Sequence, residues 1–180
     1  MTHSKTSIGL VKPKSPTNVG AVMRAAGCFQ AGAVFYTGDR YDRAERFNTD
    51  TRKTNLDIPL TGVSCLLDSA PEKAKIVCVE LVEGAISLPD FQHPEHAFYI
   101  FGPEDGTISQ DIIDSADSVV YIPTTGCLNL AATVNVVLYD RVAKSPQTVD
   151  GDELIRQSRD INNSTKVKSD SSNVSAELQE

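Results

Sequence analysis

The chain has 180 residues, of which 40% are hydrophobic and 23% are charged, a composition typical of a soluble globular domain. The net charge of −7 argues against a protein that binds nucleic acid by bulk charge attraction. No apolar run reaches the roughly 20 residues that a membrane span needs. Residues 1–14 lack the apolar core of a secretory signal, so we expect a cytoplasmic protein without a membrane partner.

Five apolar runs predict β-strands. Because β-branched and aromatic residues fill them almost continuously, we expect strands that are covered on both faces, as in a parallel sheet. The predicted strands are residues 7–11, 33–36, 75–81, 97–101 and 118–122.

Helices are predicted between these strands. Thr17 is a suitable N-cap for a helix whose apolar positions follow a helical period and which Gly32 ends. This strand, helix and strand unit predicts an α/β fold with a parallel sheet. We also expect a short helix within residues 38–57 and another at residues 109–115. The apolar positions of the first helix are Val19, Val22, Met23, Ala26 and Phe29.

A last helix is predicted from residue 128 to about residue 143. Leu130, Val134, Val137 and Leu138 lie on one face, and Val136 and Tyr139 extend the apolar surface around the helix. We therefore expect this helix to pack against more than one partner. Beyond Lys144 the chain becomes rich in Ser, Asn and Asp, which predicts a domain over residues 1–147 and a polar, mostly disordered tail over 148–180. One helical turn is expected near residues 153–159.

The distribution of charge leaves two interpretations open. Residues 1–60 contain nine Lys and Arg against five Asp and Glu, a balance of +4, whereas residues 61–180 contain eight against nineteen, a balance of −11. Acidic residues such as Asp39 and Asp42 lie among the arginines at 40–52. The basic excess is therefore either a local patch for an anionic partner or a solvated helix face.

Cysteine and histidine spacing does not indicate a metal site. Because the four cysteines have no C-x-x-C spacing and lie in apolar stretches, we expect buried, reduced thiols. His93 and His96 have a metal-like spacing, but Pro94 interrupts the segment and no third ligand is near. The common phosphate-binding glycine motifs are missing from the sequence. The four cysteines are Cys28, Cys65, Cys78 and Cys127.

Three distant segments each have the composition of a ligand-binding loop. They are residues 18–24 (NVGAVMR), 100–109 (IFGPEDGTIS) and 121–130 (YIPTTGCLNL). The second and third begin as an apolar strand, continue through Gly or Pro and small polar residues, and lead into a helix. Loops of this kind at the carboxyl ends of strands bind ligands in α/β proteins.

The order and residues of these segments resemble the SPOUT superfamily of RNA methyltransferases, in its SpoU or TrmH-like branch. Asn18 and Arg24 are similar to motif one. Gly102 to Glu104 are similar to motif two, and the Ile-Pro and Leu-Asn steps of the third segment are similar to motif three. The resemblance covers residues 7–143. It implies a mostly parallel, six-stranded sheet flanked by helices, with a C-terminal deep trefoil knot.

The resemblance also implies a function and a set of site residues. A homodimer would use S-adenosylmethionine to methylate a ribose 2′-hydroxyl of RNA, with tRNA at the anticodon loop as the first candidate and rRNA as the second. We expect Arg24 to bind a phosphate and stabilise the forming alkoxide, because a guanidinium keeps its proton too tightly to act as a base. The implied catalytic residues are Arg24, Asn18, Glu104, Asn129 and Tyr139, and the implied cofactor-binding residues are Glu80, Leu81, Gly102, Pro103, Glu104, Ile122, Pro123, Cys127, Leu128 and Leu130.

Two departures from the family pattern leave alternatives open. Gly106 follows Glu104 by two residues, where three are usual, and Cys127 stands where a serine is usual. A thiol is a weaker hydrogen-bond donor than a hydroxyl, so the methionine end of the cofactor would be held differently. The alternatives are a catalytically silent RNA-binding or assembly factor with the same fold, and a methyltransferase for a base nitrogen.

Overall fold

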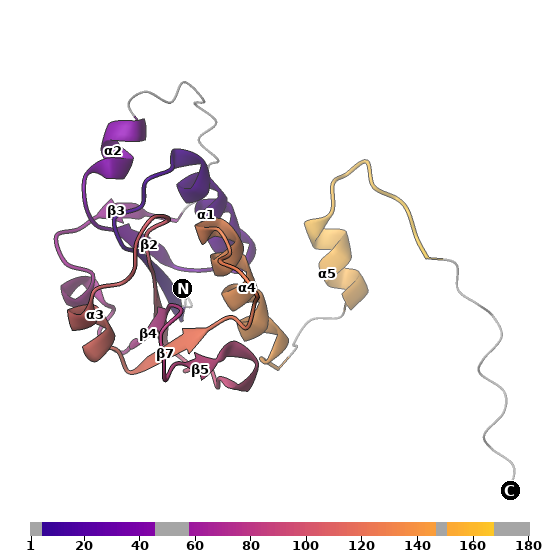
Figure 1. The fold of residues 1–180 in the computed structure, drawn as a ribbon. Coiled ribbons are helices and arrows are strands. Elements are labelled where there is room, and N and C mark those ends of the chain that lie inside the picture. Colours follow the sequence, from indigo (N-terminus) through magenta and orange to yellow (C-terminus); the bar gives the residue numbers. More distant parts are fainter. Residues whose placement is uncertain (1–4, 46–57, 147–150, 168–180) are drawn as a thin grey trace, which may run out of the picture. The chain divides into compact units, whose positions relative to one another are not determined.

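A computed structural model describes residues 5–45, 58–146 and 151–167. The chain divides into two compact units, one ending at Ser145 and the other beginning at Pro146. The first unit is a sheet with helices on both faces (Figure 1). None of the helices in the described ranges is long and apolar enough to cross a membrane.

The sheet of the first unit has seven strands in the order β3-β2-β1-β6-β4-β7-β5, and every pairing is parallel. The α/β class and the parallel sheet are confirmed, but the expected number of six strands is wrong. β3 and β5 lie at the two edges of the sheet, and none of the five predicted strands includes them. The strands are β1 (Thr6–Leu10), β2 (Ala33–Tyr36), β3 (Leu60–Gly62), β4 (Lys75–Val79), β5 (Ile86–Ser87), β6 (Ala97–Phe101) and β7 (Ser118–Tyr121).

The central strand β6 is buried on both faces of the sheet. Tyr99 and Phe101 point to one apolar cluster, and Phe98 and Ile100 point to the other, in accordance with the period of two along a strand. All five residues of the strand are buried, which explains the unbroken apolar run AFYIF.

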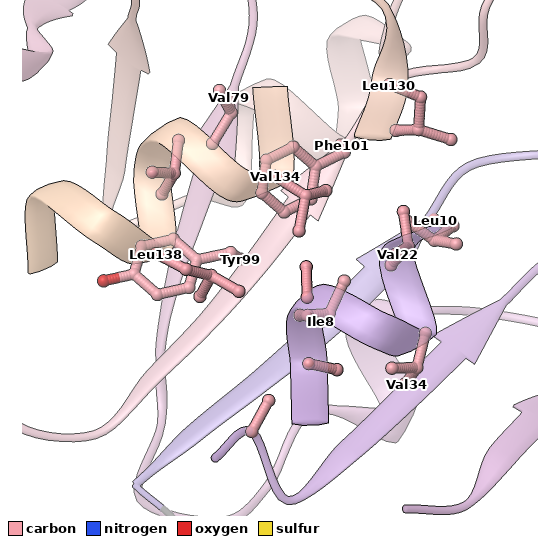
Figure 2. Packing of buried hydrophobic residues seen from close by; sticks show 14 of the residues in the cluster. Ile8, Leu10, Val22, Val34, Val79, Tyr99, Phe101, Leu130, Val134 and Leu138 are labelled. Carbon is pink, nitrogen blue, oxygen red and sulfur yellow. The ribbon is translucent and has the colours of Figure 1, made fainter. Parts of the chain in front are cut away.

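Helices α1 (Pro16–Cys28) and α4 (Leu130–Ala143) pack against each other and cover the first face of the sheet. Figure 2 shows Val22 of α1 and Val134 of α4 directed toward the strand residues Ile8, Tyr99 and Phe101. The opposite face is covered by α3 (Gln110–Asp114) and the 3-10 helix η1 (Leu67–Ser69). The predicted burial of Leu130, Val134, Val137 and Leu138 is confirmed.

The N-cap of helix α1 lies two residues earlier than Thr17, so the predicted cap is wrong. Ser15 is the N-cap, and its hydroxyl accepts a hydrogen bond of 3.3 Å from the backbone amide of Asn18. Pro16 follows at the first helical position, where its missing amide proton costs nothing. Serine and threonine are both good caps, so the position of the proline decides between them.

Two of the four cysteines are exposed, contrary to the prediction of four buried thiols. Cys28 is the last residue of α1, and Cys127 lies in the loop before α4, where neither is covered. Cys65 is half-buried. Cys78 is fully buried in β4, and this burial, followed by the charge of Glu80, raises the pKa of Cys78 to about 12.

His93 lies in a buried polar network under the end of α4. Its Nε2 donates to Asp140 at 2.8 Å, and its Nδ1 accepts from the hydroxyl of Tyr99 at 2.7 Å. Arg141 donates to the carbonyl oxygens of Pro94 and Glu95, both at 2.7 Å. The histidine therefore serves to attach α4 to the segment before β6.

The remaining helices are short. α2 (Arg40–Glu45) is the helix expected within residues 38–57, of which residues 46–57 lie outside the described part, and the 3-10 helix η2 (Leu88–Asp90) follows β5. In the second unit, α5 (Gly151–Ser158) replaces the single turn predicted at 153–159, and all its residues are exposed.

We predict that His93 makes the protein less stable at mildly acidic pH. Burial lowers the pKa of His93 and outweighs the hydrogen bond to Asp140, which acts to raise it. Below the ordinary pKa of 6.5 the unfolded chain then binds more protons than the folded chain, so the free energy of unfolding falls from pH 6.5 down to the lowered pKa. The loss is about 1.4 kcal/mol for each unit by which the pKa is lowered.

Urea denaturation of the wild type and His93→Gln at several pH values measures this effect. Glutamine can still donate to Asp140 but does not titrate, so the variant should lose less stability than the wild type in this pH range. An equal loss in the two proteins would show that His93 is not its source.

Candidate functional site

A pocket of about 400 Å³ lies where β4, β6 and β7 end. Because these neighbouring strands are parallel, their carboxyl ends reach the same edge of the sheet, and the loops that follow them surround one cavity. The three segments singled out in the sequence all contribute to it. The lining residues are Asn18, Val79, Glu80, Leu81, Phe101, Gly102, Pro103, Glu104, Gly106, Tyr121, Ile122, Thr124, Gly126, Cys127, Leu128, Asn129, Leu130 and Thr133.

Glu104 joins the first and second segments. Its carboxylate accepts hydrogen bonds from the backbone amides of Lys14 at 2.9 Å and Ser15 at 3.1 Å, and from the side-chain amide of Asn18 at 3.1 Å. Partial burial acts to raise the pKa of Glu104, but these hydrogen bonds outweigh it and hold the pKa below its ordinary value. Glu104 therefore fixes the start of α1 beside the loop that follows β6.

Glu80 holds the same loop from the other side. One oxygen of its carboxylate accepts from the amide of Leu81 at 2.9 Å, and the other accepts from the amide of Ile108 at 3.0 Å. A Cβ atom on Gly102 would lie only 2.8 Å from Oε2 of Glu80. The loop can pass this close to the carboxylate only because residue 102 is glycine.

The third segment forms the remaining wall and leads into α4. Thr124 donates from its hydroxyl to the carbonyl oxygen of Gly126 at 2.6 Å, which closes the loop after β7. Asn129 is the N-cap of α4 and accepts from the amide of Ala132 at 2.7 Å. Leu128 is 39% exposed and lines the pocket, so it is an apolar contact available to a ligand.

An ion-pair cluster links the loop after β6 to α2. The two guanidinium nitrogens of Arg40 contact the two carboxylate oxygens of Asp105 at 2.9 and 2.7 Å, and Nζ of Lys14 lies 3.6 Å from the same carboxylate. Arg43 pairs with Asp39 at 2.8 Å. These arginines thus have acidic partners, which supports a solvated helix face for this part of the basic excess.

Three of the predicted site residues do not line the pocket. Arg24 is exposed on α1, and Tyr139 is 65% exposed on α4. Pro123 lies between Ile122 and Thr124 without lining the cavity itself. All the other predicted cofactor-binding residues do line it, as do Asn18, Glu104 and Asn129.

Several lining residues were not predicted. Most directly adjoin predicted ones along the chain, so extending each motif by two residues would have found them. Thr133 is the exception, because it reaches the pocket from the first turn of α4, and only the direction of that helix determines its position. The additional lining residues are Val79, Phe101, Gly106, Tyr121, Thr124, Gly126 and Thr133.

His93 is already engaged by two other side chains. Both ring nitrogens of His93 are engaged by Tyr99 and Asp140. Across residues 5–45, 58–146 and 151–167, no three His, Cys, Asp or Glu side chains are grouped as metal ligands would be.

The fold and the pocket define an α/β protein with a cavity at the carboxyl edge of a parallel sheet. The model of the SpoU rRNA methylase family matches residues 5–139, and the chain belongs to this family. This match confirms the resemblance inferred from the three segments. No curated protein matches the chain significantly.

Solved structures share the fold. One, which concerns the 2-OH methylation of C/U34 on tRNA, has a TM-score of 0.62 and 23% identity, and the match covers 77% of this chain and 89% of that chain. The SpoU methyltransferase AviRb from Streptomyces viridochromogenes, in complex with AdoMet, has a TM-score of 0.58 and 21% identity over 77% of this chain and 57% of its own. The TrmH/SpoU tRNA modifying enzyme from A. aeolicus has a TM-score of 0.61 and 16% identity, with coverages of 78% and 75%.

We predict that Gly102→Ala opens the loop after β6. The added methyl group would lie 2.8 Å from Oε2 of Glu80, so the carboxylate must move and its bond to the amide of Ile108 is weakened. Hydrogen exchange at the Ile108 amide should become about tenfold faster, which corresponds to about 1.4 kcal/mol.

Gly126→Ala is the matched control, because Gly126 also lines the pocket but a Cβ there would meet nothing within 4 Å. It should leave the Ile108 amide unchanged. If both variants behave alike, the contact between Gly102 and Glu80 does not hold the loop.

Proposed function

We propose that this chain is an S-adenosylmethionine-dependent RNA methyltransferase that modifies a ribose 2′-hydroxyl, with the anticodon loop of tRNA as its substrate. The observation that carries the proposal is the convergence of the three motif segments on one pocket, in a chain of the SpoU family. The similarity to a structure concerned with 2-OH methylation on tRNA, of which the match covers 89%, supports the choice of substrate. The family description favours rRNA as the second candidate.

The pocket fits S-adenosylmethionine in size and in chemistry. Its volume of about 400 Å³ is within the range of small-molecule sites. Leu81, Ile122 and Leu128 offer apolar surface to an adenosine, and Thr124 and Asn129 offer polar atoms. None of the described lining residues is Lys, Arg or His, so the cavity suits a cofactor without phosphate groups better than a nucleotide.

The chain's own residues then have separate tasks. S-adenosylmethionine supplies an electrophilic methyl group on a sulfonium when it is bound. Glu104 and Asn18 hold the start of α1 at the mouth of the pocket, which orients the acceptor. Arg24 lies six residues after Asn18, about 9 Å farther along α1. In the proposed homodimer it binds an RNA phosphate and stabilises the forming alkoxide at the pocket of the partner subunit, since it lies outside the pocket of its own chain.

The proposal includes a homodimer and the deep trefoil knot typical of the family. Val136, Tyr139 and Val142 are 37%, 65% and 39% exposed, and they follow one another at intervals of three residues along α4. This second apolar face of the last helix exposes Val136 and Tyr139 within the first unit. A second copy would bury it and bring its own RNA-binding residues near the pocket, so we expect the full chain to sediment at twice the monomer mass.

Transfer of labelled methyl groups from S-adenosylmethionine to RNA tests the activity. We expect total tRNA to be labelled and the label to be found on a ribose 2′-oxygen after digestion to nucleosides. Labelled rRNA would favour the second candidate, and a methyl group on a base nitrogen would indicate different chemistry. No transfer to tRNA or rRNA would contradict an enzyme, and a silent assembly factor would in addition fail to bind S-adenosylhomocysteine in calorimetry.

We predict that Arg24→Ala removes activity but not cofactor binding. Loss of a charge-assisted contact to the transition state should lower kcat about 100-fold. The Kd for S-adenosylmethionine should change less than about twofold, because Arg24 does not line the pocket. Arg43→Ala is the control, since Arg43 is an exposed arginine paired with Asp39. An equal loss of affinity and activity in Arg24→Ala would place this residue at the cofactor instead.

A further inference from the structure

The pocket carries a formal charge of −2, and no cation lines it. Glu80 and Glu104 are the two charged residues among its described lining residues. A cavity with this charge favours a positively charged occupant over a neutral one of the same shape, because the interaction acts across a partly desolvated space.

The two carboxylates differ in how far other groups compensate their charge. Glu104 accepts three hydrogen bonds from residues 14–18, and the neighbouring Asp105 is paired with Arg40. Glu80 accepts one backbone amide on each oxygen and has no ion-pair partner in the described part of the chain. Glu80 is therefore the less compensated negative charge in the pocket.

Methyl transfer changes the charge of the ligand in this pocket. The carbon–sulfur bond breaks and a carbon–oxygen bond forms, while sulfur keeps the electron pair and loses its positive charge. The proton of the hydroxyl group leaves to solvent. The donor, with a sulfonium, an ammonium and a carboxylate, has a net charge of +1, and the thioether product has a net charge of zero.

We propose that Glu80 is a specificity residue that makes the pocket prefer the cationic methyl donor over its neutral thioether product. This inference depends on the proposed function. Glu80 strengthens binding of the donor, and the same interaction is lost at the moment of transfer, so the product leaves more easily. The carboxylate is held in place for this task by the amides of Leu81 and Ile108.

Calorimetry of the full chain with three ligands tests the proposal. S-adenosylmethionine and sinefungin both carry a positive charge near the site of transfer, the latter on an amine, whereas S-adenosylhomocysteine does not. We expect the wild type to bind sinefungin more tightly than S-adenosylhomocysteine. In Glu80→Gln this preference should fall about fivefold, as expected for the removal of one charge close to another at a partly screened site.

The ratio of the two affinities separates charge from structure. Glutamine can accept only through one oxygen, so one backbone bond of Glu80 is lost and the loop can loosen. Such loosening would lower the affinities for both ligands by the same factor and leave their ratio unchanged. Glu72→Gln is the matched control: it removes the same charge from an exposed position before β4, at the other end of the strand from Glu80, and should keep the wild-type ratio.

Three outcomes are decisive. A lower preference for sinefungin over S-adenosylhomocysteine in Glu80→Gln, with the wild-type preference kept in Glu72→Gln, supports the proposal. Binding of all three ligands with an unchanged ratio overturns the role of Glu80 but leaves the methyltransferase standing. If none of the ligands binds the wild type, the cofactor site and the role of Glu80 are both wrong. If Glu80→Gln fails to fold, the salt dependence of binding to the wild type still tests the role of charge. Added salt must then lower the affinity for sinefungin more than the affinity for S-adenosylhomocysteine.

Discussion

The parallel pairing of β4, β6 and β7 is the constraint on which the site depends. Parallel strands end at one edge of the sheet, so the loops that follow Val79, Phe101 and Tyr121 meet although they are distant in sequence. The two-sided burial of β6 holds this arrangement, since its side chains are shared between the cluster under α1 and α4 and the cluster under α3. Ile108 anchors the loop after β6 in the second cluster, and otherwise the loops depend on the strands for their positions.

Two carboxylates fix the loop that the sheet brings to the pocket. Glu104 attaches the start of α1 to the loop after β6, and Glu80 attaches the other end of that loop to the end of β4. Each satisfies backbone amides that would otherwise lack partners in a half-buried loop. The same groups leave the pocket negative, so one set of residues determines both its shape and the charge of the ligand that it favours.

The sequence predicts the central strands well and the edges of the sheet poorly. β2 and β6 have the predicted bounds: all of β6 is buried, and Val34 and Phe35 of β2 pack against the two clusters on opposite faces of the sheet. β3 and β5, with three and two residues, lie at the edges and have almost no pattern of their own; pairing with β2 and β7 defines them. β4 ends at Val79 instead of residue 81, and beyond it the Glu80 carboxylate accepts from the amide of Leu81. Cys28 and Cys127 are exposed because a helix end and a loop leave them uncovered.

The sequence by itself determined the α/β class, the family and most of the pocket lining, because these follow from apolar period and from short motifs whose residues are adjacent in the chain. Only the tertiary structure decided which carboxylate holds which loop, that Arg24 and Tyr139 lie outside the pocket, and that Val136 is uncovered on α4. The physical reason is that these properties depend on the packing of α1 against α4 and on contacts between residues up to 90 positions apart. A pattern within one segment contains no information about such contacts.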